Sequence, residues 1–486
     1  MPIPVPEYRE RLEEMTAEAL EEYYAHSAGH KPTYDIAAVY DRYADLTTLE
    51  QARALAAEGA PSELVRFACE AYVGNGTKHL SEQIANTEVS LRVEFDGEHV
   101  PYREVSPRLR NEPDAGRRRE LHARRCAATD ERLNPIYLEA ADRERELTAD
   151  LGAATVLELY EGFGYDPVGL ERSTSAFLAD TEAFYHTQID GALRQRVGLG
   201  LDDAAVPDFA RLWRAPEFDT GFDSARAVPA LRATLAGLGV DLDGQRNVEL
   251  DVDRRPGKRP RAFCAPIRVP GRVVLVMLPQ GGQDDYGALF HEAGHAEHFA
   301  HADPGLPAED RVLGDNAVTE GFAFLFEHLL ADPAWLHSLL DFGPVDEFVR
   351  FCALQKLFFL RRYSGKLAYE IALHSGARLE ELPDRYAGEL TAAVGVPYPR
   401  TDYLEDVDGG FYCTCYLRAW AFETQLRDHL RTRFGMDWFR KRAAGDLIRE
   451  LWGLGQSMRA EELLREATGA PLEFGVLADE ARAALH

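Results

Sequence analysis

The sequence predicts a mainly α-helical protein with one small β-sheet. Long stretches carry apolar residues at three- and four-residue spacing, which is the periodicity of an amphipathic helix. Strand-like runs are short, and they gather around residues 91–102 and 247–278. The chain has 486 residues, of which 45% are hydrophobic. This length allows a sizeable core, in one large domain or in about two or three smaller ones.

The first 200 residues are predicted to form a helical N-terminal region. Its one strand-like segment, residues 91–102, alternates apolar and polar residues on both sides of Asp96-Gly97, a dipeptide typical of hairpin turns. The expected helices run from about Pro6 to Ala28, from Leu49 to Ala60, around Ala115 to Leu151, and from Arg172 to Leu199.

Residues 201–486 are predicted to form the second region. Between about Gly200 and Val228 the sequence turns to Asp, Pro and Gly, which favours a boundary or a long connection. From Asp284 to the end the pattern is helical again. Just before Asp284 come three runs that predict a small sheet: NVELDVD (247–253), RAFCAPI (261–267) and RVVLVML (272–278).

The charge of the chain argues against several classes of partner. Lys and Arg number 54 against 82 Asp and Glu, which gives a formal net charge of −28. Such a surface repels the phosphates of nucleic acids and anionic lipid headgroups. The sequence shows neither a signal-like start nor an apolar run of roughly 18 residues, so we expect a cytoplasmic protein without a membrane span. Cys413 and Cys415, one residue apart, are interpreted as buried thiols rather than a zinc site.

The segment HEAGH, residues 291–295, carries the chemistry. On a helix, His291 and His295 lie four residues apart on one face and can bind the same metal ion. Glu292 lies beside them and is suited to act as a general base on water. Tyr286, Leu289 and Phe290 give the predicted helix an apolar face, and Asp284 and Asp285 are expected to cap its start.

A zinc ion in a catalytic site takes three protein ligands and leaves a fourth position open. Glu320 lies 25 residues beyond His295, at the start of the helix-like TEGFAFLFEHLL, and is the predicted third ligand. Glu327 follows two helical turns later, on the same face, and is expected to accept a hydrogen bond from a ligand imidazole. The sequence therefore predicts one zinc ion per chain.

These residues resemble a known family, the thimet oligopeptidase and oligoendopeptidase F zinc metallopeptidases. The resemblance is carried by HEAGHAEH (291–298) and by Glu320 followed by Glu327. It implies a zincin-like fold with a small sheet beside the active-site helix. It also implies two helical halves around a deep channel for short peptides, with residues 1–200 as one wall. Further similar segments are GKRPRAFC (257–264), RRYSGKLAYEIALH (361–374), FYCTCYLRAW (411–420) and GQSMRAEELLREATGAPLE (455–473).

The chain departs from the family pattern ahead of the tyrosine-rich segment. The family usually has a histidine there that helps to bind the substrate or the oxyanion. In this chain the stretch reads YLEDVDGGFYCTCY (403–416) and offers Asp406 and Asp408 instead. Either another group does this work, or the substrate differs from an ordinary oligopeptide.

The expected reaction is hydrolysis of short oligopeptides at internal bonds. Glu292 is the predicted base, and a phenol from Tyr412 or Tyr416, the latter preferred, is predicted to stabilise the developing oxyanion. The run at residues 272–278 is either a strand that binds an extended peptide or simply a buried strand.

Two rival functions remain open at this point. The first is a zinc carboxypeptidase or a small-molecule amide hydrolase, which a basic residue in the cleft would favour. The second is a peptide-binding protein without activity, against which the retained base Glu292 argues. The sequence leaves the cleavage preference and the oligomeric state undecided. The basic residues in question are Arg361, Arg362, Arg400 and Arg418.

Overall fold

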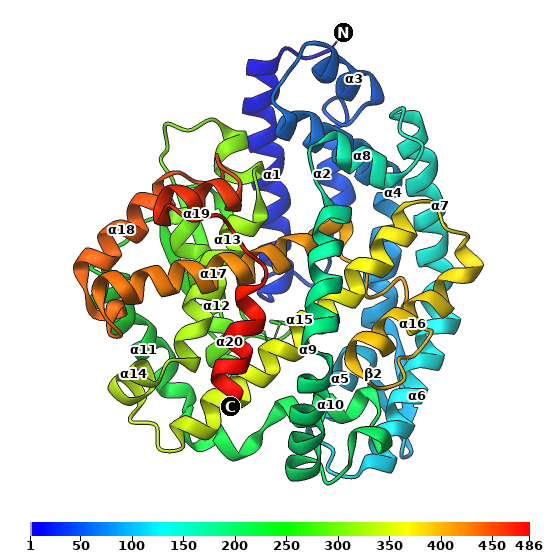
Figure 1. The fold of residues 1–486 in the computed structure, drawn as a ribbon. Coiled ribbons are helices and arrows are strands. Elements are labelled where there is room, and N and C mark those ends of the chain that lie inside the picture. Colours follow the sequence, from blue (N-terminus) through cyan, green and yellow to red (C-terminus); the bar gives the residue numbers. More distant parts are fainter. Residues whose placement is uncertain (1, 260) are drawn as a thin grey trace.

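Helices make up most of the structure, and the strands form one hairpin and one three-stranded sheet (Figure 1). The prediction of a mainly helical fold with a small sheet is thereby confirmed. This computed structural model describes residues 2–259 and 261–486, so Pro260 of the GKRPRAFC segment lies outside the described residues. Among the helices described, none combines the length and the apolar composition that crossing a bilayer requires.

The predicted hairpin is present in the N-terminal region. Strands β1 (Arg92–Phe95) and β2 (Glu98–Pro101) pair antiparallel, and Asp96 and Gly97 both adopt positive φ angles in the turn, of 58° and 77°. The helices around it are α1 (Val5–Ser27), α2 (Ile36–Arg42), α3 (Leu49–Ala57), α4 (Ser62–Ser90), α5 (Val105–Asn111), α6 (Ala115–Arg132), α7 (Asn134–Asp150), α8 (Val156–Gly162) and α9 (Pro167–Arg196).

The helical pattern at residues 115–151 proves to be two helices rather than one. Helix α6 ends at Arg132, and α7 begins at Asn134 with a proline in its first turn. Pro135 has no N–H to continue the hydrogen bonds of α6, but it fits the first turn of a new helix, so α6 ends and the chain turns at Leu133.

The stretch between Gly200 and Val228 is more ordered than its composition suggested. The stretch contains α10 (Val206–Arg214), which buries Phe209, Leu212 and Trp213. Its last residues already belong to α11 (Ser224–Gly237). The main core is continuous across residue 200, because Tyr185 and other residues of α9 pack into it. The division of the chain into two regions at this position stays a prediction.

The three-stranded sheet has the order β3-β5-β4, with β3 (Val248–Asp251) parallel to β5 (Arg272–Val276) and β4 (Phe263–Arg268) antiparallel to it. Of the two interpretations of residues 272–278, the structure supports the buried strand. Strand β5 is central and largely buried, so both of its edges are already paired and it cannot take up a further strand. Helix α1 covers one face of the sheet through Ala17, together with Ala28 just after its end, and α12 lies close to β4 and β5.

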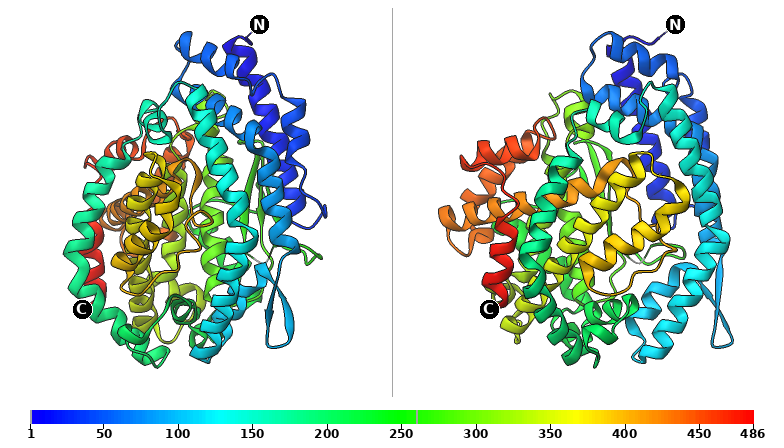
Figure 2. Two further views of the ribbon diagram at one scale, coloured as in Figure 1. Left: turned by 90° about the vertical axis from the view of Figure 1, so that its right-hand side faces the viewer. Right: turned by 45° about the vertical axis from the view of Figure 1, so that its right-hand side comes forward.

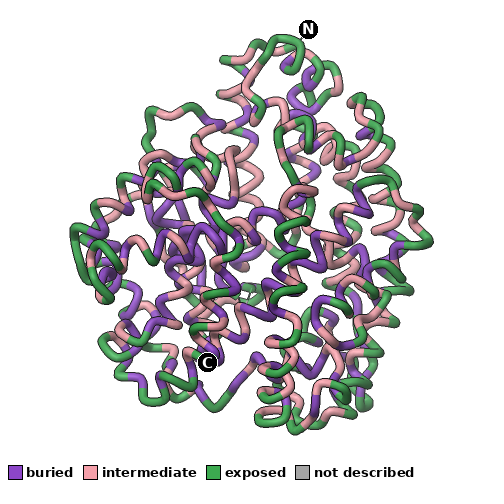
Figure 3. The backbone as a smooth tube through the Cα atoms, in the orientation of Figure 1, coloured by how far each residue is buried: buried purple, intermediate pink, exposed green. Residues whose placement is uncertain are grey.

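The remaining helices form the centre and the far side of the molecule. In both views of Figure 2 the first helices, blue to cyan, lie opposite the last ones, orange to red. The most deeply buried chain lies where α12, α13 and α17 pack together (Figure 3). These helices are α12 (Gln283–His301), α13 (Asn316–Glu327), α14 (Pro333–Trp335), α15 (Val345–His374), α16 (Leu382–Val394), α17 (Tyr412–Phe434), α18 (Arg442–Gly453), α19 (Ala460–Thr468) and α20 (Val476–Leu485).

Candidate metal centre

Helix α12 presents the HEAGH segment to the interior. The prediction that aspartates cap this helix is wrong, because its N-cap is Gly282 and no side chain caps it. Asp285 lies in the first turn, where its carboxylate accepts the backbone N–H groups of Gln280 and Gly281 at 2.5 and 2.7 Å. The carboxylate thus fixes the loop between strand β5 and α12 rather than capping the helix.

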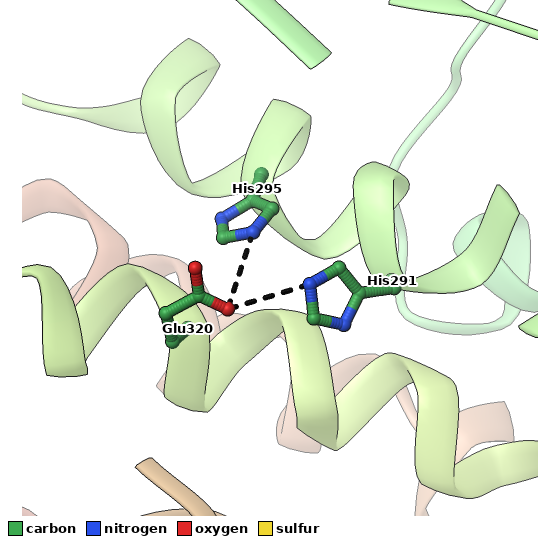
Figure 4. A group of neighbouring side chains, drawn as sticks. All are labelled: His291, His295 and Glu320. Atoms are coloured by element: carbon green, nitrogen blue, oxygen red, sulfur yellow. Dashed lines mark ion pairs between the residues drawn. The ribbon is translucent and has the colours of Figure 1, made fainter. Parts of the chain in front are cut away.

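Helices α12 and α13 cross closely at Gly294. A Cβ atom at this position would lie 2.6 Å from the Cα of Ala323 and from the carbonyl oxygen of Phe322. Only glycine allows the two backbones to approach in this way. The crossing brings Glu320 of α13 within reach of His291 and His295 (Figure 4).

The three predicted ligands form one compact group. The Nε2 atoms of His291 and His295 lie 3.4 and 3.6 Å from Oε2 of Glu320, and one ligand atom from each residue falls within 4.8 Å of the others. Bonds of about 2.0–2.1 Å at tetrahedral angles place zinc ligands about 3.3 Å apart. The group therefore has the spacing of a zinc site, with both imidazoles and the carboxylate turned toward a common point (Figure 4).

Contacts behind the ligands orient both imidazoles. Nδ1 of His291 lies 2.8 Å from Oε2 of Glu327, and Nδ1 of His295 lies 2.8 Å from the hydroxyl of Thr319. With Nδ1 engaged in each ring, Nε2 is the nitrogen left to bind a metal ion. Glu327 thus lies where the sequence placed it, whereas Thr319 was missed. Its position directly before Glu320, on the helix that crosses the motif, was the available signal.

The two oxygens of Glu320 have different surroundings. Oε1 accepts the hydroxyl of Tyr412 at 2.7 Å, whereas Oε2 is buried and has no hydrogen-bond partner among the described residues. Leaving a buried carboxylate oxygen without a partner is costly. A cation between the two imidazoles and this oxygen would satisfy it, so the residues present fit a zinc ion.

The electrostatics of the group also favour a cation. Burial opposes ionisation of Glu320, but the neighbouring His295 and His291 hold its pKa well below the usual range. Burial likewise opposes protonation of His291, yet Glu320 and Glu327 keep the pKa of this imidazole well above its ordinary value. The centre thus stabilises positive charge at the point that the three ligand atoms surround.

Glu292 lies on the same helix, beside the ligands. Its Oε2 accepts the backbone N–H of Cys264 in strand β4 at 2.9 Å. No described residue donates to its other oxygen, Oε1. One oxygen is therefore held by the sheet, and the other is left to accept a proton.

His298, three residues after His295, does not join the three predicted ligands. It is buried, and its Nε2 lies 3.1 Å from the carbonyl oxygen of Gly455.

The two candidate tyrosines of α17 have different environments. The hydroxyl of Tyr412 is engaged by Glu320. Tyr416 packs against Tyr412 and Tyr363, with ring centroids 5.1 and 5.3 Å apart, and its hydroxyl bonds to no described residue. Burial and the charge of Glu320 raise the pKa of Tyr416, so this phenol keeps its proton and can donate it in a hydrogen bond.

Asp406 and Asp408, which stand near the place of the family's histidine, are bound to helix α15. Asp406 accepts two hydrogen bonds from Arg362, at 2.6 and 2.7 Å, and one from Tyr386 at 2.8 Å. Asp408 accepts one from Lys366 at 2.6 Å. Both carboxylates are thus paired, and they fix the segment that leads into α17 rather than presenting a free acid to the centre.

A cavity of about 340 Å³ adjoins the centre through Tyr412. Its opposite wall comes from helix α4 of the N-terminal region, with Arg66 and Glu70, and from Tyr160 and Tyr165. Glu70 accepts hydrogen bonds from Arg66 at 3.1 Å and from Tyr160 at 2.9 Å. The cavity is therefore lined by polar groups of both regions of the chain.

Comparison with known proteins adds no assignment. No protein-family model matches the chain, and no curated protein sequence matches it.

Proposed function

We propose that the chain is a zinc-dependent metalloendopeptidase that hydrolyses short oligopeptides. One zinc ion per chain would be held by His291, His295 and Glu320. The observation that carries this proposal is the buried Oε2 of Glu320, which lies 3.4 and 3.6 Å from two imidazole nitrogens and has no hydrogen-bond partner among the described residues. The proposal agrees with the resemblance of the motifs to the thimet oligopeptidase and oligoendopeptidase F family.

When bound, zinc supplies a Lewis acid that lowers the pKa of water to about 7 and so provides a nucleophile at neutral pH. Glu292, held by the N–H of Cys264, takes the proton from the attacking water and passes it to the leaving amine. Tyr416 donates its hydroxyl hydrogen to the carbonyl oxygen as negative charge develops there. The hydroxyl of Tyr412 donates a hydrogen bond to Oε1 of Glu320, so Oε2 would be the oxygen that binds the metal.

The surroundings of the centre suit an extended peptide of limited size. Strand β4 is an edge strand, and the N–H of Cys264 points away from β5 to Glu292, so this edge faces the centre. A peptide lying along β4 would bring its backbone beside Glu292. The cavity between α4 and α17 reaches the centre only at Tyr412, and its opposite wall comes from the N-terminal helices, as a channel with these helices as one wall requires.

The four arginines that the sequence suggested for a terminal carboxylate are all paired, whereas Arg261, whose charge acts on Tyr416, makes no ion pair among the described residues. A carboxypeptidase needs a free cation for the terminal carboxylate, yet each arginine that the sequence suggested is already paired with a carboxylate. The pairs are Arg361 with Glu182, Arg362 with Asp406, Arg400 with Asp384, and Arg418 with Asp315 and Glu461.

The test is cleavage of a mixed oligopeptide library by wild-type protein and by Glu292→Gln, with zinc content measured in both. We expect internal cleavages by the wild type, and a loss of about 100- to 10,000-fold in the variant at unchanged zinc content, because only the base is removed. Glu146→Gln, which changes an exposed carboxylate of α7, serves as the control.

Three outcomes would contradict parts of the proposal. Zinc binding without any peptide cleavage by the wild type would indicate a small-molecule amide hydrolase. Removal of single C-terminal residues would indicate a carboxypeptidase. Activity in Glu292→Gln equal to that of the wild type would remove the assigned base.

A further inference from the structure

A second, larger cavity lies farther from the metal centre. It measures about 400 Å³ and lies between helices α4 and α7 on one side and the end of α15 on the other. Gly409 lines both this cavity and the one next to the centre, so the two adjoin. The polar side chains of its lining include Thr77, Ser81, Glu144, Arg145, Thr148 and His374.

One face of helix α4 runs along both cavities. Arg66 and Glu70 line the first, and Val73, Thr77 and Ser81 line the second. Successive members of this row are three or four residues apart, which puts them on one face of the helix. At 1.5 Å per residue the row spans about 22 Å, the length of about seven residues of extended peptide. We call the two cavities, which share this helix face and Gly409, the groove.

The far part of this groove contains a carboxylate without a partner. Glu144 lines the cavity and makes no hydrogen bond or ion pair with any described residue, and burial raises its pKa although Arg145 opposes this. The guanidinium of Arg145 donates to the carbonyls of Leu373 and Ala377, at 3.2 and 3.0 Å, and so serves the end of α15. Arg145 acts on Glu144 through its charge without a hydrogen bond to it, so the carboxylate oxygens are left to accept hydrogen bonds from a group outside the chain.

His374 stands in the same lining as a second unsatisfied group. Its side chain is only 6% exposed, and its Nε2 is buried without a hydrogen-bond partner in the described part of the chain. Burial, assisted by the charge of Arg145, lowers the pKa of His374 to about 4, so the ring is neutral at neutral pH. A neutral imidazole adds no repulsion toward a cation and offers a lone pair or an N–H to a polar ligand.

We propose that Glu144 and His374 form a recognition site for a cationic group of the peptide substrate, an ammonium or a guanidinium. This inference rests on the proposed function, because it takes the ligand to be a peptide that extends along α4 from the metal centre. Its physical basis is that a partly buried carboxylate without a partner gains most from a cation that enters with the ligand. The net charge of −28 favours the approach of such ligands.

The cation has two possible sources, a lysine or arginine side chain or the N-terminal amine of the peptide. Binding of seven-residue peptides to the zinc-loaded Glu292→Gln protein separates them, because peptides bind there without being cleaved. One series is acetylated and amidated and carries a single lysine at each position in turn, with norleucine as the neutral match. A second series is neutral in its side chains and has a free or an acetylated N-terminus.

We expect at least about tenfold tighter binding of the cationic peptide in one series, at a lysine position remote from the scissile bond or with the free amine. Adding Glu144→Gln should abolish this preference and leave binding of the neutral peptides unchanged. Adding Glu146→Gln, on the same helix but 66% exposed and paired with Arg143, should retain it. Glu144→Lys should reverse the preference in favour of peptides with glutamate at the same position.

Equal binding of cationic and neutral peptides throughout both series would overturn the inference, as would a preference that survives both substitutions of Glu144. Cleavage of the neutral peptides by wild-type protein is measured alongside. Neutral peptides that are cleaved without any cation preference would refute this site alone. A cation preference that depends on Glu144, without cleavage of any peptide, would refute the proposed function and keep the site.

Discussion

At the scale of single residues, the centre depends on how the oxygens of Glu320 are divided. Tyr412 takes Oε1, and Oε2 is left between two imidazoles whose other nitrogens are held by Glu327 and Thr319. Contacts of this kind orient metal ligands, and their loss typically weakens metal binding by about 10- to 100-fold. The order at the centre thus comes from residues outside the set of predicted ligands.

Removal of the two tyrosine hydroxyls is predicted to affect different properties, zinc affinity for Tyr412 and kcat for Tyr416. Tyr412→Phe frees Oε1 of Glu320, so we expect zinc binding about tenfold weaker in a competition titration with a chelator. Tyr416→Phe leaves the ligands untouched, so we expect normal zinc affinity and a kcat reduced by about 100-fold, because a donor to the developing oxyanion is lost. Equal zinc affinity in both variants together with a selective loss of kcat in Tyr412→Phe would exchange the two roles.

At the scale of elements, the crossing of α12 and α13 positions the ligands. Gly294→Ala places a methyl group 2.6 Å from the backbone of α13 and must push the helices apart. We expect the free energy of unfolding to fall by about 1–3 kcal/mol and zinc affinity to fall with it, since Glu320 moves relative to the imidazoles. Thermal or denaturant unfolding of the metal-free and zinc-loaded forms measures both effects.

Gly287→Ala is the matched control on the same helix. A Cβ atom there meets nothing within 4 Å, so the substitution should stabilise the helix by up to about 1 kcal/mol without changing zinc affinity. If Gly294→Ala behaved like this control, the close crossing would not be what positions the ligands.

The sequence predicts correctly those features that depend on residues close together in the chain. The Asp96-Gly97 turn, the strand-like runs and the four-residue spacing of His291 and His295 each follow from short-range backbone geometry. What it missed depends on contacts between distant segments. The central place of β5 is set by pairing on both sides, and the role of Thr319 exists only because α13 crosses α12. The break at Leu133 had a local signal in Pro135 that the long helical pattern outweighed.

At the scale of the whole molecule, partly buried ion pairs join the C-terminal helix to the centre. Glu480 of α20 accepts hydrogen bonds from Lys356 of α15, at 2.7 Å, and from Arg427 of α17. Glu423 of α17 shares both of these cations. Since α17 also carries Tyr412 and Tyr416, this network links the end of the chain to the helix that lines the metal centre.

The network predicts a loss of stability in acid. Burial opposes ionisation of Glu480, but Lys356 and Arg427 lower its pKa to about 2. A carboxyl group whose pKa is lower in the folded state stabilises the fold above its unfolded pKa of about 4.3, and this contribution is lost as the pH falls toward 2. Unfolding measured between about pH 5 and pH 2 should therefore show a falling stability that Glu480→Gln makes shallower.

At neutral pH the same variant should cost on the order of 1–3 kcal/mol, because it leaves the two cations underpaired. Asp479→Asn, an adjacent carboxylate that is 85% exposed, should change neither quantity appreciably. Identical acid profiles for Glu480→Gln and the wild type would show that the network does not control acid stability.

The most direct test of the central claim is the zinc content and zinc affinity of the purified protein and its ligand variants. After chelation and reloading, we predict one zinc ion per wild-type chain and at least about 100-fold weaker binding in His291→Gln, His295→Gln and Glu320→Gln. His301→Asn, on the same helix but bonded to the carbonyl of Glu297, should bind zinc like the wild type. Wild-type protein that takes up no zinc, or ligand variants that bind it as tightly as the wild type, would contradict the metal centre and the function proposed from it.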